Sequence, residues 1–156
     1  METVILNDSL RFSFPDGFRK MSEEELKQVR TYKSGPGVCL RDDDRHIIVS
    51  LGHRRAGLLA ALLNGKDLIK SAQSRIAGVM KPFGYRLTGY QDRVLAGKTA
   101  PSFQYTYTAQ GVRMVGECCA LKMNKTLYYL HCYVRQSCLE EGSQTWKEIL
   151  ETASFS

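Results

Sequence analysis

The chain has 156 residues, the length of one domain, and its 43% apolar and 24% charged residues are the composition of an ordinary soluble globular protein. Fibrous and intrinsically disordered classes are therefore excluded. The formal net charge is +6, from 22 Lys and Arg against 16 Asp and Glu, but the basic residues are scattered and no zinc-finger or RNP motif accompanies them. We expect a single domain, residues 1–156, that does not bind nucleic acid.

The cysteines and the apolar runs indicate the compartment. Five cysteines, an odd number, show no CxxC spacing. The amino terminus, METVILNDSL, has neither a basic region nor a long apolar core, so it does not resemble a signal peptide. The longest aliphatic cluster, GLLAALL at 57–63, is far shorter than the ~20 residues that span a bilayer. These features predict a cytoplasmic protein with free thiols, no membrane span, no metal and no cofactor.

The first residues predict a hairpin followed by a helix. Residues 3–6 and 10–14 are strand-like and flank the turn sequence NDS. Ser22 with Glu25 three residues later forms a capping box, so we expect a helix from Ser22 to about Tyr32.

An acidic turn at residues 42–44 separates two further strand-like runs, VCLRDDD and HIIVSLG. Three adjacent carboxylates are candidate ligands for a hard cation, but calcium loops space their acids alternately around a glycine. We therefore predict a solvated hairpin turn, whose charge Arg41 and Arg45 neutralise.

The second half of the chain predicts a helix, four strands and a final helix. Apolar residues recur at helical spacing from Asp67 to Met80, and KPFG at 81–84 ends that helix. A last helix at about 143–153 carries Trp146 on its apolar stripe. The four strands between these helices are expected at about 85–94, 98–109, 112–123 and 126–135.

This order of elements resembles the PsbP/Mog-like fold, a curved antiparallel sheet with helices on both faces. The similar segments are FSFPDGFRKMSEEEL at 12–26, KDLIKS at a helix start, GYRLTGY leading into GKTAPSFQYTYTAQG, and KTLYYLHCYVR before the last helix. The resemblance implies an α+β protein of three layers with seven or eight antiparallel strands. It also implies a binding or assembly role, since most members of this fold are not enzymes.

Turns at Gln110–Gly111 and Asn124–Lys125 would fix the register of the last three strands. Cys118 then lies directly across from His131, with Cβ atoms ~5 Å apart. Side chains alternate between the faces of a sheet. One side, here called the aromatic face, therefore collects Phe103, Tyr105, Tyr107, Cys118, Tyr129, His131 and Tyr133. The opposite, aliphatic face collects Val115, Cys119, Leu121, Met123, Tyr128, Leu130, Cys132 and Val134.

These two faces lead to different expectations. We expect the apolar stripe of the 67–80 helix to cover the aliphatic face. The aromatic face is either a second helix-covered core or a concavity that binds a ligand, and its seven residues are the candidate binding face. Gly116 lies between Tyr105 and Tyr133, where an aromatic ring can cover a bare glycine.

Two smaller sites are candidates. A nucleophilic Cys118 with His131 as its base needs access, a low thiol pKa and a third group that orients the histidine. In this register no Asp or Asn neighbours His131 on its face. The run His53, Arg54 and Arg55 closes a strand and is a candidate anion contact, because guanidinium groups suit carboxylates and phosphates.

Three functions remain open. The resemblance favours a non-enzymatic binding or assembly protein that engages a protein or peptide on the aromatic face. The alternative is a chaperone-like homodimer for an apolar client segment. A thiol-dependent enzyme that uses Cys118 and His131 is the third hypothesis. The expected partner is a protein or peptide, and the chain is expected to be a monomer or a homodimer.

Overall fold

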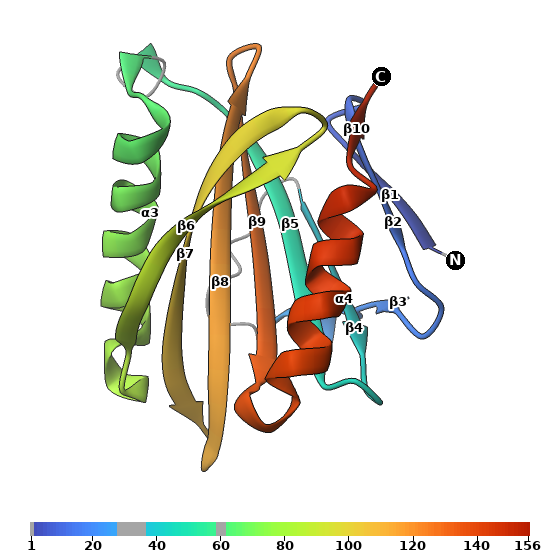
Figure 1. The fold of residues 1–156 in the computed structure, drawn as a ribbon, viewed down its shortest axis with the longest axis vertical. Coiled ribbons are helices and arrows are strands. Elements are labelled where there is room, and N and C mark those ends of the chain that lie inside the picture. The colour runs from blue at the N-terminus through green and yellow to red at the C-terminus, as the bar shows by residue number, and fades with distance from the viewer. Residues whose placement is uncertain (1, 28–36, 59–61) are drawn as a thin grey trace.

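The computed structural model describes residues 2–27, 37–58 and 62–156 as two antiparallel sheets with helices packed on them (Figure 1). The large sheet has the strand order β3-β4-β5-β9-β8-β7-β6. Its strands are β3 (Arg19–Lys20), β4 (Gly37–Asp42), β5 (Ile47–Arg55), β6 (Arg86–Leu95), β7 (Lys98–Ala109), β8 (Val112–Met123) and β9 (Thr126–Arg135). The α+β class and the four long strands of the second half are as predicted.

A small sheet joins the two ends of the described chain. β1 (Glu2–Leu6) pairs with β2 (Leu10–Phe14), as predicted, and β2 also pairs with β10 (Ser154–Phe155). Figure 1 accordingly shows the marked termini on the same side of the molecule. Neither β10 nor β3 was predicted, since two residues carry no periodic pattern and pair only with partners distant in sequence.

Two tight turns hold the meander in register. Gln110 and Gly111 have φ of 51° and 77°, and Asn124 and Lys125 have φ of 50° and 65°. Two consecutive positive φ values are the signature of the type I′ turn that suits the twist of a hairpin. Cys118 consequently pairs with both Phe103 and His131. The predicted register is confirmed.

The helices begin near the predicted positions. Ser22 caps α1 (Glu23–Leu26) through the predicted capping box, and the remainder of the expected helix to Tyr32 lies outside the described residues. Asn64 caps α3 (Gly65–Met80) by accepting the amide of Asp67 at 2.9 Å. No helix in the described part of the chain is long and apolar enough to cross a membrane.

The last helix, α4 (Leu139–Glu151), begins four residues earlier and ends two residues earlier than predicted. It follows a short 3-10 turn (Gln136–Cys138) and places Gly142 against the side chain of Val134. A side chain at position 142 would overlap Val134, so the glycine lets the first turn of α4 approach β9.

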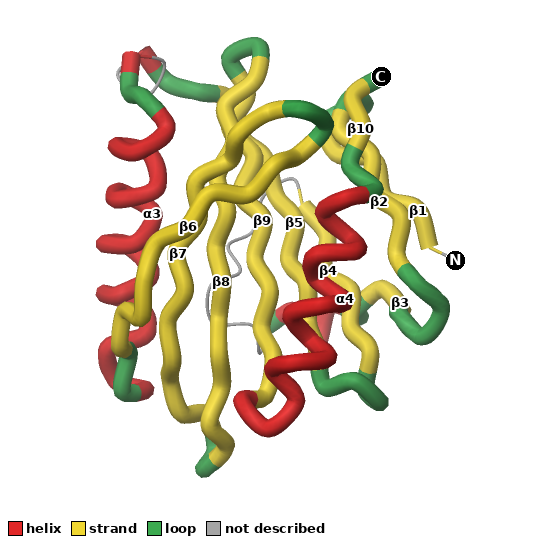
Figure 2. Tube along the Cα trace, viewed as in Figure 1, coloured by secondary structure: helices red, strands yellow, loops and turns green. Residues whose placement is uncertain are grey.

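The two large helices cover opposite faces, and the sequence-based assignment of α3 was wrong. Ile69, Ala72, Ile76 and Met80 of α3 pack with Phe103 and Tyr105 on the aromatic face. α4 and the small sheet cover the aliphatic face, where Trp146 and Phe12 join the core. Figure 2 shows α4 in front of the strands and α3 on the far side of β6 and β7. Both helices have an apolar stripe, so hydrophobicity alone could not assign either one to a face.

Candidate functional site

The aromatic face is a helix-covered core over most of its area. Phe103, Tyr105 and Cys118 have no exposed surface, and Tyr107, His131 and Tyr133 are at least 92% buried. Tyr129 is half-buried. The candidate binding face is therefore not an open surface as a whole. The sequence predicts either a second helix-covered core or a ligand-binding concavity for this face. The part that lies under α3 is a helix-covered core.

Three polar side chains form a hydrogen-bonded chain inside this core. The Cys118 Sγ lies 3.2 Å from His131 Nε2, and His131 Nδ1 lies 3.0 Å from the Tyr133 hydroxyl. Burial raises the pKa of the Cys118 thiol above its ordinary value. Burial, with a smaller contribution from the Arg75 charge, lowers the pKa of His131 to about 4. Both shifts favour the neutral thiol and the neutral imidazole, which is the opposite of an activated thiolate–imidazolium pair.

The residue that orients His131 is a tyrosine, not the Asp or Asn that a thiol catalyst would use. The Tyr133 hydroxyl lies against His131 Nδ1, and burial raises the pKa of this tyrosine well above its ordinary value. A neutral phenol can fix the tautomer of the imidazole, but it carries no negative charge to stabilise an imidazolium. Among the described residues, no three His, Cys, Asp or Glu side chains are placed to hold a metal ion.

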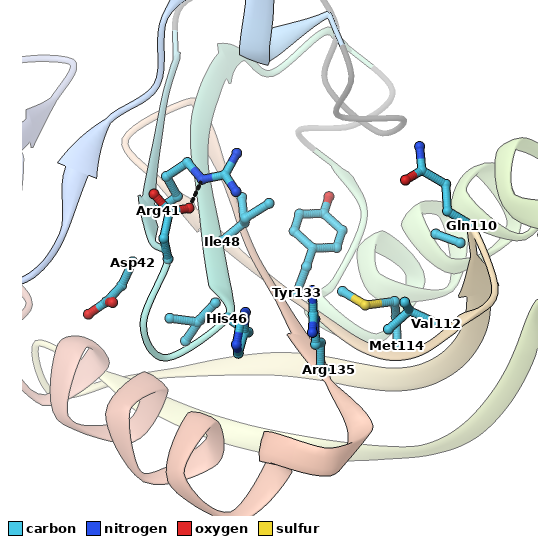
Figure 3. A pocket seen from close by; sticks show the side chains of 12 residues that line it. Arg41, Asp42, His46, Ile48, Gln110, Val112, Met114, Tyr133 and Arg135 are labelled. Atoms are coloured by element: carbon cyan, nitrogen blue, oxygen red, sulfur yellow. Dashed lines mark hydrogen bonds and ion pairs between the residues drawn. The ribbon is translucent and has the colours of Figure 1, made fainter.

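The aromatic face opens into a groove at the end of the sheet near the β4–β5 and β7–β8 turns. The groove has a volume of about 200 Å³. Ile48, Tyr133 and Met114 lie side by side on adjacent strands and line it together with Val112 (Figure 3). Around this apolar centre stand Arg41, His46, Gln110 and Arg135.

The two rim arginines differ in their electrostatics. Arg41 donates to Asp43 at 2.6 Å and to Glu25 at 3.1 Å, and Arg19 donates to both acids as well. The hydrogen bonds from Arg19 lower the pKa of Glu25 to about 2. Arg41 is thus neutralised within a four-charge network. Arg135, by contrast, forms no ion pair with any described acid.

The acidic turn is a hairpin turn with arginine partners, as predicted, but its first carboxylate is buried and not solvated. Asp42 is 3% exposed and accepts the backbone amides of Asp44 and Arg45 at 3.0 and 3.1 Å. The Arg45 guanidinium also donates to Asp42, and Arg41 donates to Asp43. The charges of Asp42 and Asp43 are therefore neutralised by the two flanking arginines, and the Asp42 carboxylate shapes the hairpin.

The anion candidate at the end of β5 divides into two parts. His53, Arg54 and Arg55 all line a cavity of about 410 Å³, together with Asn7, Asn124, Lys125 and Thr126. Alternation along β5, however, sends the Arg54 side chain to the aromatic face, where it donates to the Tyr129 hydroxyl at 3.2 Å. His53 lies on the other face, with its ring centroid 6.3 Å from that of Tyr128. The three residues do not act as one cluster.

Sequence reasoning missed the residues that give the groove its polarity. Arg135, Gln110 and His46 were not candidates, although the predicted register already placed position 135 opposite Met114. The signal was therefore present in the strand ends.

A buried carboxylate on the aliphatic face was also missed. Glu117 is 5% exposed and accepts hydrogen bonds from Gln91, Arg93, Gln104 and Trp146 at 2.7–3.0 Å. Both carboxylate oxygens are satisfied by donors that belong to this chain. The cluster therefore links β6, β7 and α4 to β8, and its hydrogen-bonding groups are satisfied within this chain.

Solved structures of three proteins share this architecture. Cyanobacterial PsbP (CyanoP) from Synechocystis sp. PCC 6803 superimposes with a TM-score of 0.66 over 96% of this chain and 88% of its own, at 12% identity. The Ran-binding protein Mog1p from Saccharomyces cerevisiae gives 0.56 over 97% and 93%, at 10% identity. LpqN from Mycobacterium tuberculosis, which is involved in cell envelope biogenesis, gives 0.55 over 94% and 83%, at 14% identity.

These similarities establish the fold. The chain has the PsbP/Mog-like fold that its order of elements predicted. Its sequence matches no protein-family model and no curated protein. At identities this low, the structural neighbours carry no residue-level information about a site.

Proposed function

We propose that this protein is a non-catalytic binding protein that holds a protein or peptide segment in the groove at the open end of the aromatic face. The observation that carries the proposal is the lining of the groove. Ile48, Val112, Met114 and Tyr133 offer an apolar bed, and Arg135 offers a positive charge that no described acid neutralises. The Ran-binding character of Mog1p supports a protein as the partner.

The size of the groove favours one or two side chains of a partner over a free metabolite. Its volume of about 200 Å³ is below the ~300–1,000 Å³ of typical small-molecule pockets. The matching segment has one apolar side chain that fills the groove and an acidic residue that reaches Arg135. Such an anchor surrounded by polar contacts is the usual arrangement of a peptide hot spot.

A random peptide library selected against the purified protein tests this proposal. We expect enrichment of an apolar residue beside Asp or Glu. The Arg135→Glu variant should bind the selected peptides at least tenfold more weakly, and replacing their acidic residue with Lys should restore affinity. Arg113→Glu is the matched control, because Arg113 is an exposed arginine of β8 whose side chain contacts Thr106 at 3.2 Å, away from the groove.

The paired charge reversals in Arg135 and in the peptide distinguish binding in the groove from nonspecific attraction to the positively charged protein. Equal losses in Arg135→Glu and Arg113→Glu, or selected peptides that are indifferent to both variants, would overturn the proposed site. A selection that yields no peptide above background would overturn the proposed function itself.

The non-catalytic part of the proposal has its own test. Cys138 is half-buried, while Cys39, Cys118, Cys119 and Cys132 are buried. In the native protein we expect iodoacetamide to modify Cys138 first and Cys118 no faster than the other buried thiols. Rapid alkylation of Cys118 that is slowed by His131→Ala would revive the thiol-enzyme hypothesis. We also propose that the protein works in the cytoplasm, where five free thiols are compatible with the reducing conditions.

A further inference from the structure

Two arginines from different elements meet at one tyrosine ring on the aromatic face. The guanidinium carbon of Arg54, near the end of β5, lies 5.4 Å from the ring centroid of Tyr129 in β9. The guanidinium carbon of Arg75, in the middle of α3, lies 5.2 Å from the same centroid. Arg54 also donates a hydrogen bond to the Tyr129 hydroxyl at 3.2 Å.

No carboxylate among the described residues pairs with either of these two charges. Neither arginine forms an ion pair with an acidic side chain in the described residues. The sequence of the two internal segments outside the described ranges, 28–36 and 59–61, contains no Asp or Glu. Arg19 and Arg41 differ from this pair, because both form ion pairs with Glu25 and Asp43.

Contact with the Tyr129 ring alone does not explain why two guanidinium groups lie so close together. A cation–π contact at an accessible site contributes about 0.5–1 kcal/mol, and a second guanidinium at the same ring adds repulsion between like charges. Each guanidinium carries five N–H donors, of which Tyr129 accepts one from Arg54. The remaining donors and the double positive charge suit an anion.

The sheet beside the ring has few side chains. The row of paired residues that contains Tyr129 runs through Gly37, Gly52 and Ala120. Gly37 is exposed and Gly52 is half-buried. The two glycines place no side chain on β4 and β5 in the row of Tyr129, whose hydroxyl accepts from Arg54.

We propose that Arg54, Arg75 and the hydroxyl of Tyr129 bind a phosphate monoester. A carboxylate would balance one of the two charges, whereas a phosphate monoester carries about −1.5 to −2 at pH 7. Guanidinium groups bind phosphate oxygens through paired N–H donors, and the tyrosine hydroxyl can donate its proton to a third oxygen. The site is separate from the groove, since Tyr129 lies four residues, or about 13 Å, from Tyr133 along β9.

Calorimetric titration of the full chain tests the site with three probes: inorganic phosphate, glycerol 3-phosphate and a Gly-phosphoserine-Gly peptide. We expect saturable binding, weakened about tenfold or more by Arg54→Gln and by Arg75→Gln, because each removes charge-assisted hydrogen bonds. Two matched control variants each lose one positive charge from a residue outside the contact with the Tyr129 ring. Arg55→Gln changes the next residue of β5, on the opposite face, and Lys70→Gln changes an exposed residue of α3.

The probes also identify the source of the phosphate. Preference for the phosphopeptide would indicate a phosphorylated side chain, and preference for glycerol phosphate would indicate a small metabolite. Equal affinity for all three would indicate that the phosphate group alone is recognised. Equal weakening in Arg54→Gln and Arg55→Gln, or a response that does not saturate, would overturn the proposal. Thermal unfolding of each variant verifies that the fold is retained.

Discussion

The two faces of the large sheet bury polar groups in different ways. On the aliphatic face, the Glu117 carboxylate receives donors from β6, β7 and α4 and is satisfied at both oxygens. On the aromatic face, the Tyr105 hydroxyl has no hydrogen-bond partner in the described part of the chain, and Arg54 and Arg75 meet without an acid. The first arrangement is closed and structural. The second leaves hydrogen-bonding groups without a partner among the described residues.

Glu117→Ala should give the largest effect. The substitution leaves the half-buried Arg93 guanidinium and the buried Trp146 indole N–H without their acceptor. Breaking a buried pair from one side costs about 3–5 kcal/mol of unfolding free energy, which denaturant titration measures. Glu151→Ala is the control, because its partner Lys147 is 4.0 Å away and both side chains are at least 60% exposed. A loss no larger than that of the control would contradict the structural role of Glu117.

Acid should destabilise the protein through the aromatic face. The folded-state pKa of His131 is lowered to about 4, below the ~6.5 of an unfolded histidine. The unfolded chain therefore binds one more proton between pH 4 and 6.5, so stability falls as the pH falls through this window and the effect is complete below pH 4. The full difference is roughly 3 kcal/mol.

Urea unfolding at a series of pH values measures this slope. His131→Gln removes the titrating group, and its unfolding free energy should lose this part of the pH dependence. A variant that keeps the full slope of the original protein between pH 4 and 6.5 would show that other groups, not His131, cause the acid sensitivity.

Gly116→Ala should cost about 1–3 kcal/mol, the range for overpacking a core. A Cβ at this position would overlap the ring of Tyr105, which lies over the glycine as the sequence predicted. Gly78→Ala provides a control of opposite sign. Gly78 lies inside α3 with open space around it, so alanine there should stabilise the protein by about 0.5–1 kcal/mol. Two losses of similar size would show that the contact with Tyr105 does not matter.

Local patterns were sufficient for the long strands and insufficient for the packing of the layers. Turn residues at 110–111 and 124–125 fix the register, and the register alone placed Cys118 beside His131. The face on which α3 packs depends on how Ile69 and Ile76 fit among residues such as Ala120, and no periodicity reports that fit. The Arg54–Tyr129–Arg75 contact was equally hidden. It joins residues of β5, β9 and α3, which only the packing of α3 brings together.

The smallest expected effect concerns two tyrosines of the aromatic face. The Tyr105 hydroxyl is buried without a protein partner, so Tyr105→Phe should leave the unfolding free energy unchanged or raise it by up to about 1 kcal/mol. Tyr133→Phe should lower it by about 1–3 kcal/mol, because His131 Nδ1 loses its partner at 3.0 Å. Differential scanning calorimetry of both variants measures the difference. If Tyr105→Phe is the more destabilising variant, the Tyr105 hydroxyl makes a hydrogen bond in solution beyond the described contacts, and the contrast between the two faces of the sheet is smaller than those contacts indicate.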